Sequence, residues 1–317
     1  ILQTLPQAIQ TMLDPADCGP ACLSLSQDVQ GETYEYPEEF FKERVHNIRR
    51  PRPDDFQIKQ AAEQIKKSKN PLLISGGGVF YSDAMEDLSN FAIKHNIPVT
   101  QTVMGYSTMK RDHSHFLGPI GGLGGKAANN LAKQTDLAIA VGTKLADFTT
   151  GSWANFENPD FSLVSVNVSR FDASKHLAQS VIGDAKVSLQ ELSNALGDWK
   201  APDEWHKKSR DELKNWNDYV DKESGPTNQE LPSYAHAVGA IYRNSDPTDI
   251  AVTAAGGLVG EVVQIWRPKE LNTHETEWGF SCMSYEISGA LGVKMANPDK
   301  EVIALSLIHI SEPTRLT

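Results

Sequence analysis

Four ionisable side chains lie close in sequence to one turn of small and apolar residues, and they are His274, Glu275, Glu277 and Glu286. The turn itself reads Ser281, Cys282, Met283. An imidazole or a carboxylate beside a substrate can give or take a proton, or bind a hydroxyl group. Each of the four could equally be a solvated or structural polar group, so these residues alone leave the choice open.

A glycine-rich turn, AAGGLVG at 254–260, is the second feature that could do chemistry. The pattern predicts a strand from Ile250 to Thr253 before it and a helix through EVVQIW after it. Backbone N–H groups at the start of a helix attract anions, and Gly256 and Gly257 would let a phosphate approach closely. A plain strand-to-helix turn explains the same residues equally well.

The other glycine clusters fit phosphate-binding patterns poorly. Gly122, Gly124 and Ala127 satisfy a loose G-x-G-x-x-A pattern, but the sequence before them reads as a loop rather than the strand that a dinucleotide site needs. A P-loop fails because no Ser or Thr follows Lys126. The SGGG at 75–78 is better suited to a tight strand exit and close helix packing. We interpret all of these glycines as structural.

Alternating apolar strands and helices position these turns. The pattern predicts a doubly wound, mostly parallel α/β sheet of about 140 residues, a usual domain size. Its strands are expected at Pro71 to Ser75, Pro98 to Thr102, Asp136 to Val141, Leu163 to Val168 and Val181 to Gly183, with helices from the first strand through Phe91 and from Ala185 to Leu196. A helix is also expected at the N-terminus, followed by a short strand from Ala21 to Leu25.

Composition narrows the possible partners. The net charge of -11 and pI of 5.3 argue against a nucleic-acid or anionic-membrane partner. No apolar run approaches the roughly 20 residues of a membrane helix. Cys18, Cys22 and Cys282 are an odd set without paired metal spacing, which favours a reducing compartment, and hence the cytoplasm.

Segments along the chain resemble successive landmarks of the thiamine-diphosphate enzymes, a family that includes acetolactate synthase and pyruvate decarboxylase. They are CGPACLSLSQDVQ, LLISGGG, VMGYSTMKRDHSHFLGPIGG, LAIAVGTKLADFTTG, VIGDAKVSL and LPSYAHAVGAI. The resemblance implies that partial cofactor-binding α/β domains flank the central domain. The implied division is 1–50 (end of the pyrimidine-binding domain), 51–200 (central domain), 201–231 (linker) and 232–305 (start of the diphosphate-binding domain).

The resemblance also implies a cofactor site that binds thiamine diphosphate and Mg²⁺. Gly256, Gly257 and Leu258 match the turn whose backbone contacts the diphosphate. Met283 matches the bulky apolar side chain against which the cofactor bends. The Met283 N–H and the Ser281 carbonyl would hold the aminopyrimidine edge, with Cys282 between them. Without the resemblance, an ordinary core methionine is the preferred interpretation of Met283.

Within the family, residues 282–286 depart from the acetolactate synthase pattern, in which a Gly-Phe-Gly or Gly-Tyr-Gly follows the Met. They resemble the hydrolases of inositol breakdown, which implies hydrolysis of the C–C bond between the two carbonyls of a cyclic, polyol-derived 1,2-dione. An acetolactate synthase-like carboligase and a non-catalytic α/β binding module are the alternatives. The cofactor of this family lies between subunits, so a homodimer or tetramer is expected.

Both ends of the sequence are unusual for such an enzyme. The glutamate that activates the pyrimidine ring is expected before Ile1, and the metal-binding Asp and Asn are expected after Leu305. Residues 306–317 continue no periodic pattern and resemble a translated sequencing adapter, so we expect them to lie outside the fold. This polypeptide alone is therefore expected neither to turn over substrate nor to hold the cofactor tightly.

Overall fold

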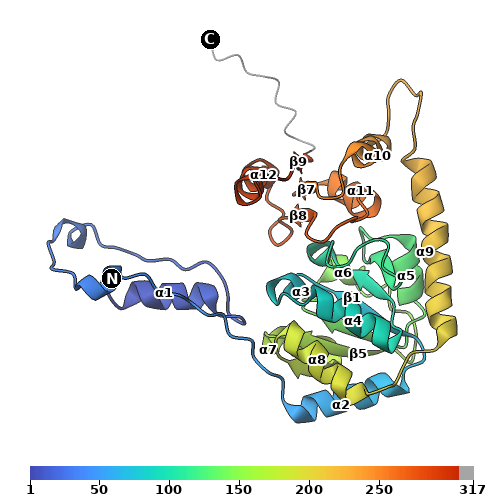
Figure 1. Cartoon of the computed structure of the whole chain (residues 1–317), viewed down its shortest axis with the longest axis horizontal. Coiled ribbons are helices and arrows are strands. Elements are labelled where there is room, and N and C mark those ends of the chain that lie inside the picture. Colours follow the sequence, from blue (N-terminus) through green and yellow to red (C-terminus); the bar gives the residue numbers. More distant parts are fainter. Residues whose placement is uncertain (307–317) are drawn as a thin grey trace.

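The computed structural model describes residues 1–306 and begins with an extended N-terminal arm (Figure 1). The arm holds α1 (Thr4–Leu13) and two 3-10 turns, η1 (Val29–Gly31) and η2 (Glu38–Phe41). The strand expected from Ala21 to Leu25 is wrong: these residues are exposed and irregular. A strand needs a hydrogen-bonded neighbour, and no described strand runs beside this segment. Most of the adapter-like tail, residues 307–317, lies outside the described residues.

The central domain is a six-stranded sheet in which every neighbouring pair is parallel, in the order β3-β2-β1-β4-β5-β6. This confirms the doubly wound α/β prediction. The prediction of a loop before Gly122 is wrong, because a strand forms there. This strand ends in Gly-Pro, which is typical of a turn, and its pairing with β2 is irregular between Val99 and Thr100. The strands are β1 (Pro71–Ser75), β2 (Val99–Gln101), β3 (Phe116–Pro119), β4 (Leu137–Val141), β5 (Ser162–Asn167) and β6 (Gln179–Ile182).

Helices cover both faces of this sheet. The predicted bounds of α8 are confirmed: Asp184 caps its first turn, and Leu189, Leu192 and Leu196 face the core. The helix expected after β1 is divided in two at Asp83, whose φ is 51°. The helical elements are α2 (Asp55–Lys67), α3 (Gly78–Tyr81), α4 (Met85–His95), η3 (Val103–Gly105), α5 (Lys126–Ala132), α6 (Asp147–Thr150), α7 (Arg170–Ser174), η4 (Lys175–Leu177) and α8 (Ala185–Leu196).

The glycines after β1 lie at the switch point of the central sheet, between β1 and β4. The Gly76 N–H donates to the Val141 carbonyl (2.9 Å), and the Gly78 N–H donates to the Gly142 carbonyl (2.9 Å). A Cβ on Gly76 would lie 2.3 Å from the Gly142 oxygen. Only glycine allows this close approach of the two backbones, which supports the structural interpretation of SGGG.

The glycines after β3 are structural for the same reason. A Cβ on Gly124 would lie 2.5 Å from the Ile120 carbonyl carbon, and one on Gly125 would lie 2.5 Å from the Trp216 indole nitrogen. Trp216 belongs to α9 (Asp203–Glu223), the long helix beside the central domain. These glycines allow close packing and leave no room for a phosphate.

The C-terminal part is a smaller parallel sheet in the order β8-β7-β9. Its elements are α10 (Tyr234–Asn244), β7 (Ile250–Thr253), α11 (Gly257–Ile265), β8 (His274–Thr276), α12 (Tyr285–Ala296) and β9 (Val302–Ala304). Buried polar contacts join it to the rest of the chain. The Arg111 guanidinium donates to the Tyr242 hydroxyl (2.6 Å), and Arg267 binds Asn217 and Asp221 of α9. Within residues 1–306, no helix combines the length and apolar character needed to cross a bilayer.

We predict that Gly76→Ala lowers the free energy of unfolding by about 3 kcal/mol, because its methyl group would overlap the Gly142 carbonyl. Urea unfolding followed by far-UV circular dichroism measures this loss. Gly292→Ala is the matched control: it lies inside α12, and an added Cβ there meets nothing within 4 Å. The control should leave the free energy of unfolding unchanged or raise it by about 0.5–1 kcal/mol. Equal losses in the two variants would contradict the packing argument.

Candidate functional site

The glycine turn at 254–260 and the loop that contains Met283 lie at the same edge of the β8-β7-β9 sheet, where the strands have their carboxyl ends. From β7 the chain crosses to β8 through α11, then returns across β7 to β9 through α12, so the two helices lie on opposite sides of the strands (Figure 1). Ligands of such sheets bind at the carboxyl ends of the strands where the winding direction changes. The glycine turn begins at the end of β7, and the Met283 loop begins at the end of β8.

The glycine turn has the conformation and the free space that an anion needs. Gly256 has φ 92° and ψ -179°, a combination open essentially to glycine alone. Gly257 begins α11; no side chain caps this end, and an added Cβ would meet nothing within 4 Å. The first N–H groups of a helix have no partners within the helix, and the helix dipole favours negative charge there. The turn therefore fits a diphosphate group.

Leu258 contributes to this turn through its backbone. Its side chain is buried against the core, whereas Gly256 and Gly257 are exposed. Gly260 of the same helix packs against Leu123 of the central domain, and the Gln264 amide donates to the Leu123 carbonyl (3.2 Å). The central domain thus fixes the helix whose N-terminus faces the candidate anion site.

Residues 278–284 form an exposed loop that leads into α12. Met283 is 66% exposed and Phe280 is 91% exposed. The alternative that Met283 is an ordinary core methionine is therefore wrong. Ser281 and Ser284 adopt positive φ values of 53° and 80°, which non-glycine residues rarely do. The loop is a defined, locally strained structure that carries Ser281, Cys282 and Met283 on the surface.

Two of the four candidate acids and bases, His274 and Glu275, lie on opposite faces of one strand. His274 and Glu275 are neighbours in β8, and neighbouring strand residues point to opposite faces. His274 is buried: its Nε2 lies 3.3 Å from the Thr253 hydroxyl, and its ring lies edge-on to Tyr106, with centroids 5.5 Å apart. Burial lowers the pKa of His274 to about 4. His274 is therefore a neutral packing residue between strands at neutral pH.

Glu275 faces the side of the sheet on which α12 lies. Its carboxylate accepts a hydrogen bond from the Tyr285 hydroxyl (3.3 Å). Burial raises the pKa of Glu275, and the hydrogen bond from Tyr285 only partly opposes that shift. Burial, and after it the charge of Glu275, raises the pKa of Tyr81 in α3. Glu275 can thus hold a proton at a higher pH than an exposed glutamate does.

The other two carboxylates have different surroundings. The Glu277 oxygens accept the N–H groups of Phe280 (2.7 Å) and Cys282 (2.6 Å) in the loop itself. Glu286 lies in the first turn of α12 and is buried. The structure therefore places the four candidates in four different environments. Sequence reasoning missed the contact between Tyr106 and His274, because no motif marks Tyr106.

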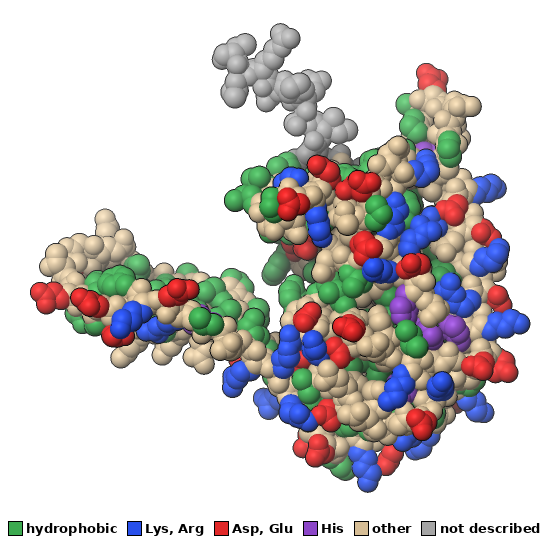
Figure 2. Space-filling view, in the orientation of Figure 1, with side chains coloured by type: hydrophobic (Ala, Val, Ile, Leu, Met, Phe, Trp, Pro, Cys, Tyr) green, Lys and Arg blue, Asp and Glu red, His purple; other side chains and the backbone are tan. Residues whose placement is uncertain are grey.

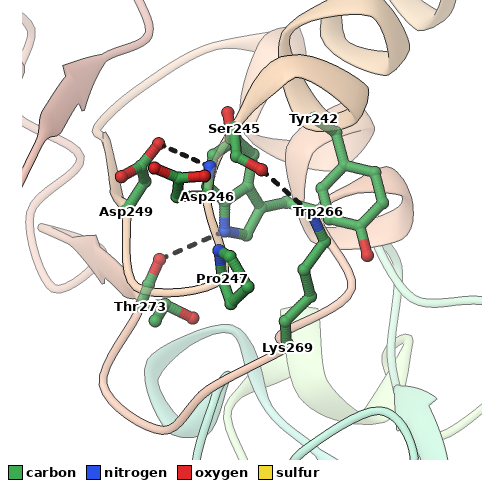
Figure 3. A pocket seen from close by; sticks show the side chains of 8 residues that line it. All are labelled: Tyr242, Ser245, Asp246, Pro247, Asp249, Trp266, Lys269 and Thr273. Atoms are coloured by element: carbon green, nitrogen blue, oxygen red, sulfur yellow. Dashed lines mark hydrogen bonds between the residues drawn. The ribbon is translucent and has the colours of Figure 1, made fainter.

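The enclosed pocket in Figure 3 lies at the other edge of the small sheet. Asp249 and Thr273, which line it, immediately precede β7 and β8. Its volume of about 10 Å³ holds about one water molecule. The Trp266 indole donates to the Thr273 carbonyl there (3.2 Å). This pocket is a packing defect near α10 and does not belong to the candidate site.

No group of three or more His, Cys, Asp or Glu side chains within residues 1–306 is arranged to hold a metal ion. The nearest part of the sheet to the expected metal ligands is the end of β9, where the Leu305 N–H donates to the Val252 carbonyl (2.9 Å). The described residues of the site therefore fit the diphosphate, while none of them is assigned to a metal.

Comparison with known protein families shows to which family this chain is related. The model of the thiamine pyrophosphate enzyme central domain matches residues 58–192, and that of the C-terminal TPP binding domain matches residues 254–306, beginning at the glycine turn. The chain belongs to the thiamine pyrophosphate enzymes. These two matches together cover more than half of the sequence.

Individual relatives share one name. The chain is 40% identical to 3D-(3,5/4)-trihydroxycyclohexane-1,2-dione hydrolase of Clostridium tetani and 38% identical to that of Geobacillus thermodenitrificans, over 96% of this chain and 51% of each relative. The hydrolase of Clostridium perfringens is 37% identical over the same shares. The chain thus spans about half the length of the curated relatives it matches.

We predict that His274→Gln flattens the pH dependence of stability. The folded pKa of His274, about 4, lies below the unfolded value of 6.5, so this histidine destabilises the fold progressively as pH falls from about 6.5 to 4. Removing it should reduce the loss of unfolding free energy over that window by about 3 kcal/mol. Urea unfolding at a series of pH values measures the effect. The exposed His46→Gln is the control, and an unchanged profile in His274→Gln would contradict burial as the cause.

Proposed function

We propose that this chain is the central and diphosphate-binding part of a hydrolase that opens 3D-(3,5/4)-trihydroxycyclohexane-1,2-dione to 5-deoxyglucuronic acid. The observation that carries the proposal is the uncapped, glycine-lined start of α11 at the same sheet edge as the exposed Met283 loop. The substrate is the one for which the similar hydrolases of Clostridium tetani and Geobacillus thermodenitrificans are named. Water is added across the C–C bond between two carbonyls: one carbonyl carbon receives the hydroxyl group and the other receives a proton.

Thiamine diphosphate, when bound, supplies an electron sink for the carbon that loses its bond. The chain's own residues would bind and orient this cofactor. The N–H groups of Gly257 and Leu258 would face the diphosphate, and the Met283 side chain would support the bent cofactor. The Ser281 carbonyl and the Met283 N–H would hold the aminopyrimidine edge. Glu275, whose pKa burial raises, would donate or accept the substrate proton.

The proposal extends to the setting of the intact enzyme. We propose Mg²⁺ as the counter-ion of the diphosphate and the cytoplasm as the location, which the three unpaired cysteines support. A homodimer or tetramer is supported by the apolar side chains gathered over α12 (Figure 2). Ile287, Leu291 and Met295 recur at four-residue spacing there and are 55%, 63% and 75% exposed.

The experiment uses the full-length protein encoded at this locus, supplied with thiamine diphosphate and Mg²⁺. Chromatography should show 5-deoxyglucuronate formed from the dione, dependent on the thiamine cofactor, and no acetolactate formed from pyruvate. Acetolactate formation without dione consumption would instead establish a carboligase. Activity that survives complete cofactor removal would refute the proposal.

We predict that Met283→Ala in the full-length enzyme lowers kcat by roughly 100-fold at saturating cofactor, because a misplaced reacting group costs about that much. Met283→Leu should retain most of the activity, since the two side chains have similar volumes. Steady-state kinetics on the dione measure both. Ile93→Ala is the control, because Ile93 is also an exposed apolar side chain but belongs to α4 of the central domain. Equal activity in Met283→Ala and wild type would argue against the supporting role.

We predict that Gly257→Ala raises the Kd for thiamine diphosphate about tenfold or more. The methyl group would occupy the open space before α11 and obstruct hydrogen bonds to a charged group. Isothermal titration calorimetry with thiamine diphosphate and with unphosphorylated thiamine separates the two parts of the cofactor. Only the diphosphate should lose affinity, and Gly292→Ala should affect neither. An equal loss of affinity for unphosphorylated thiamine would contradict a diphosphate site at Gly257.

A further inference from the structure

The carboxylate of Glu277 binds the backbone of the loop that follows it. Oε1 accepts the Phe280 N–H (2.7 Å), and Oε2 accepts the Cys282 N–H (2.6 Å). Both oxygens of one side chain are thus engaged by residues three and five positions along the chain. Hydrogen bonds from backbone N–H groups to a carboxylate are shorter and stronger than those between neutral groups.

Backbone hydrogen bonds also hold the end of this loop. The Tyr285 N–H donates to the Cys282 carbonyl (3.3 Å), and the Ile287 N–H donates to the Ser284 carbonyl (3.2 Å), both at the start of α12. The positive φ values of Ser281 and Ser284 cost free energy and persist only where surrounding contacts enforce them. The Glu277 carboxylate supplies two such contacts directly beside Ser281.

The loop has a second anchor on the central domain. The Trp278 ring lies edge-on to Phe148 of α6, with centroids 5.1 Å apart, and Trp278 also packs against the apolar cluster of Val103, Tyr106, Val259 and Val263. Trp278 thus fixes the start of the loop, while Glu277 folds its middle back toward β8. Phe280 and Met283, two large apolar side chains of the loop, project into solvent.

The bonding of Glu277 is unsuited to proton transfer. The backbone N–H groups of Cys282 and Phe280 lower the pKa of Glu277, which keeps the carboxylate ionised at neutral pH. Burial raises the pKa of the Cys282 thiol, and the nearby Glu277 charge adds to that increase. The contrast with Glu275, whose pKa is raised, separates the roles of two carboxylates that are two residues apart.

We propose that Glu277 is a positioning residue whose carboxylate folds residues 278–284 and thereby sets where Met283 stands at the carboxyl edge of the sheet. The role assigned to Met283 rests on the proposed function, whereas the folding of the loop by Glu277 does not.

The first test measures the loop without any cofactor. Hydrogen exchange followed by mass spectrometry should show amides of residues 278–285 exchanging about 10-fold faster in Glu277→Gln, because glutamine replaces one of the two accepting oxygens with an NH2 group, which cannot accept an N–H. Glu277→Asp keeps the charge but is shorter, and should give an intermediate rate. Glu301→Gln is the matched control, since Glu301 is exposed and lies near β9. Unchanged exchange in folded Glu277→Gln would overturn the proposal.

The second test uses the full-length enzyme. Glu277→Gln should raise the Kd for thiamine diphosphate and lower kcat, and the shape of the pH–rate profile should stay as in wild type. Loss of one limb of that profile would instead make Glu277 an acid or base and overturn the positioning role. Faster loop exchange in a protein that shows no thiamine dependence would support the Glu277 role and refute the proposed function, so the two failures are distinguishable.

Discussion

Parallel pairing of three short strands is the constraint on which the candidate site depends. In a parallel sheet, every strand ends at the same edge, so the turns after β7 and β8 meet there although 24 residues of sequence separate Thr253 from Glu277. The pairing also places β7 in the centre, and the chain therefore winds in both directions from it. The sheet therefore determines the positions of both the glycine turn and the Met283 loop, even without a direct contact between them.

The central domain acts as a support for this edge. At its own switch point, the backbones of Gly76 and Gly142 lie against each other. Three of its side chains contact the small sheet and its helices: Leu123 packs on α11, Tyr106 packs on β8, and Phe148 packs on the loop residue Trp278. The central domain therefore contacts both the helix that follows the glycine turn and the loop that carries Met283.

Sequence patterns predicted the elements whose signal is local. Continuous apolar runs predicted β1, β4 and β7, and the spacing of Val187, Leu189, Leu192 and Leu196 predicted α8. The three-residue β8 was missed because its residues, His-Glu-Thr, carry no apolar pattern of their own. The strand expected at 21–25 failed for the opposite reason, since an apolar run without a neighbouring strand has nothing to pair with.

The candidate site was predicted in part because its turns are continuous in sequence. What could not be read from the sequence is which way each carboxylate points. His274, Glu275 and Glu277 lie within four residues, yet one is buried between strands, one faces Tyr285, and one binds its own loop. These differences depend on a strand that ends at Thr276 and on two partners from elsewhere in the chain, Tyr285 of α12 and Tyr106 directly after η3. The residue types therefore identified the candidates from the sequence, whereas the surroundings of each side chain depend on tertiary contacts.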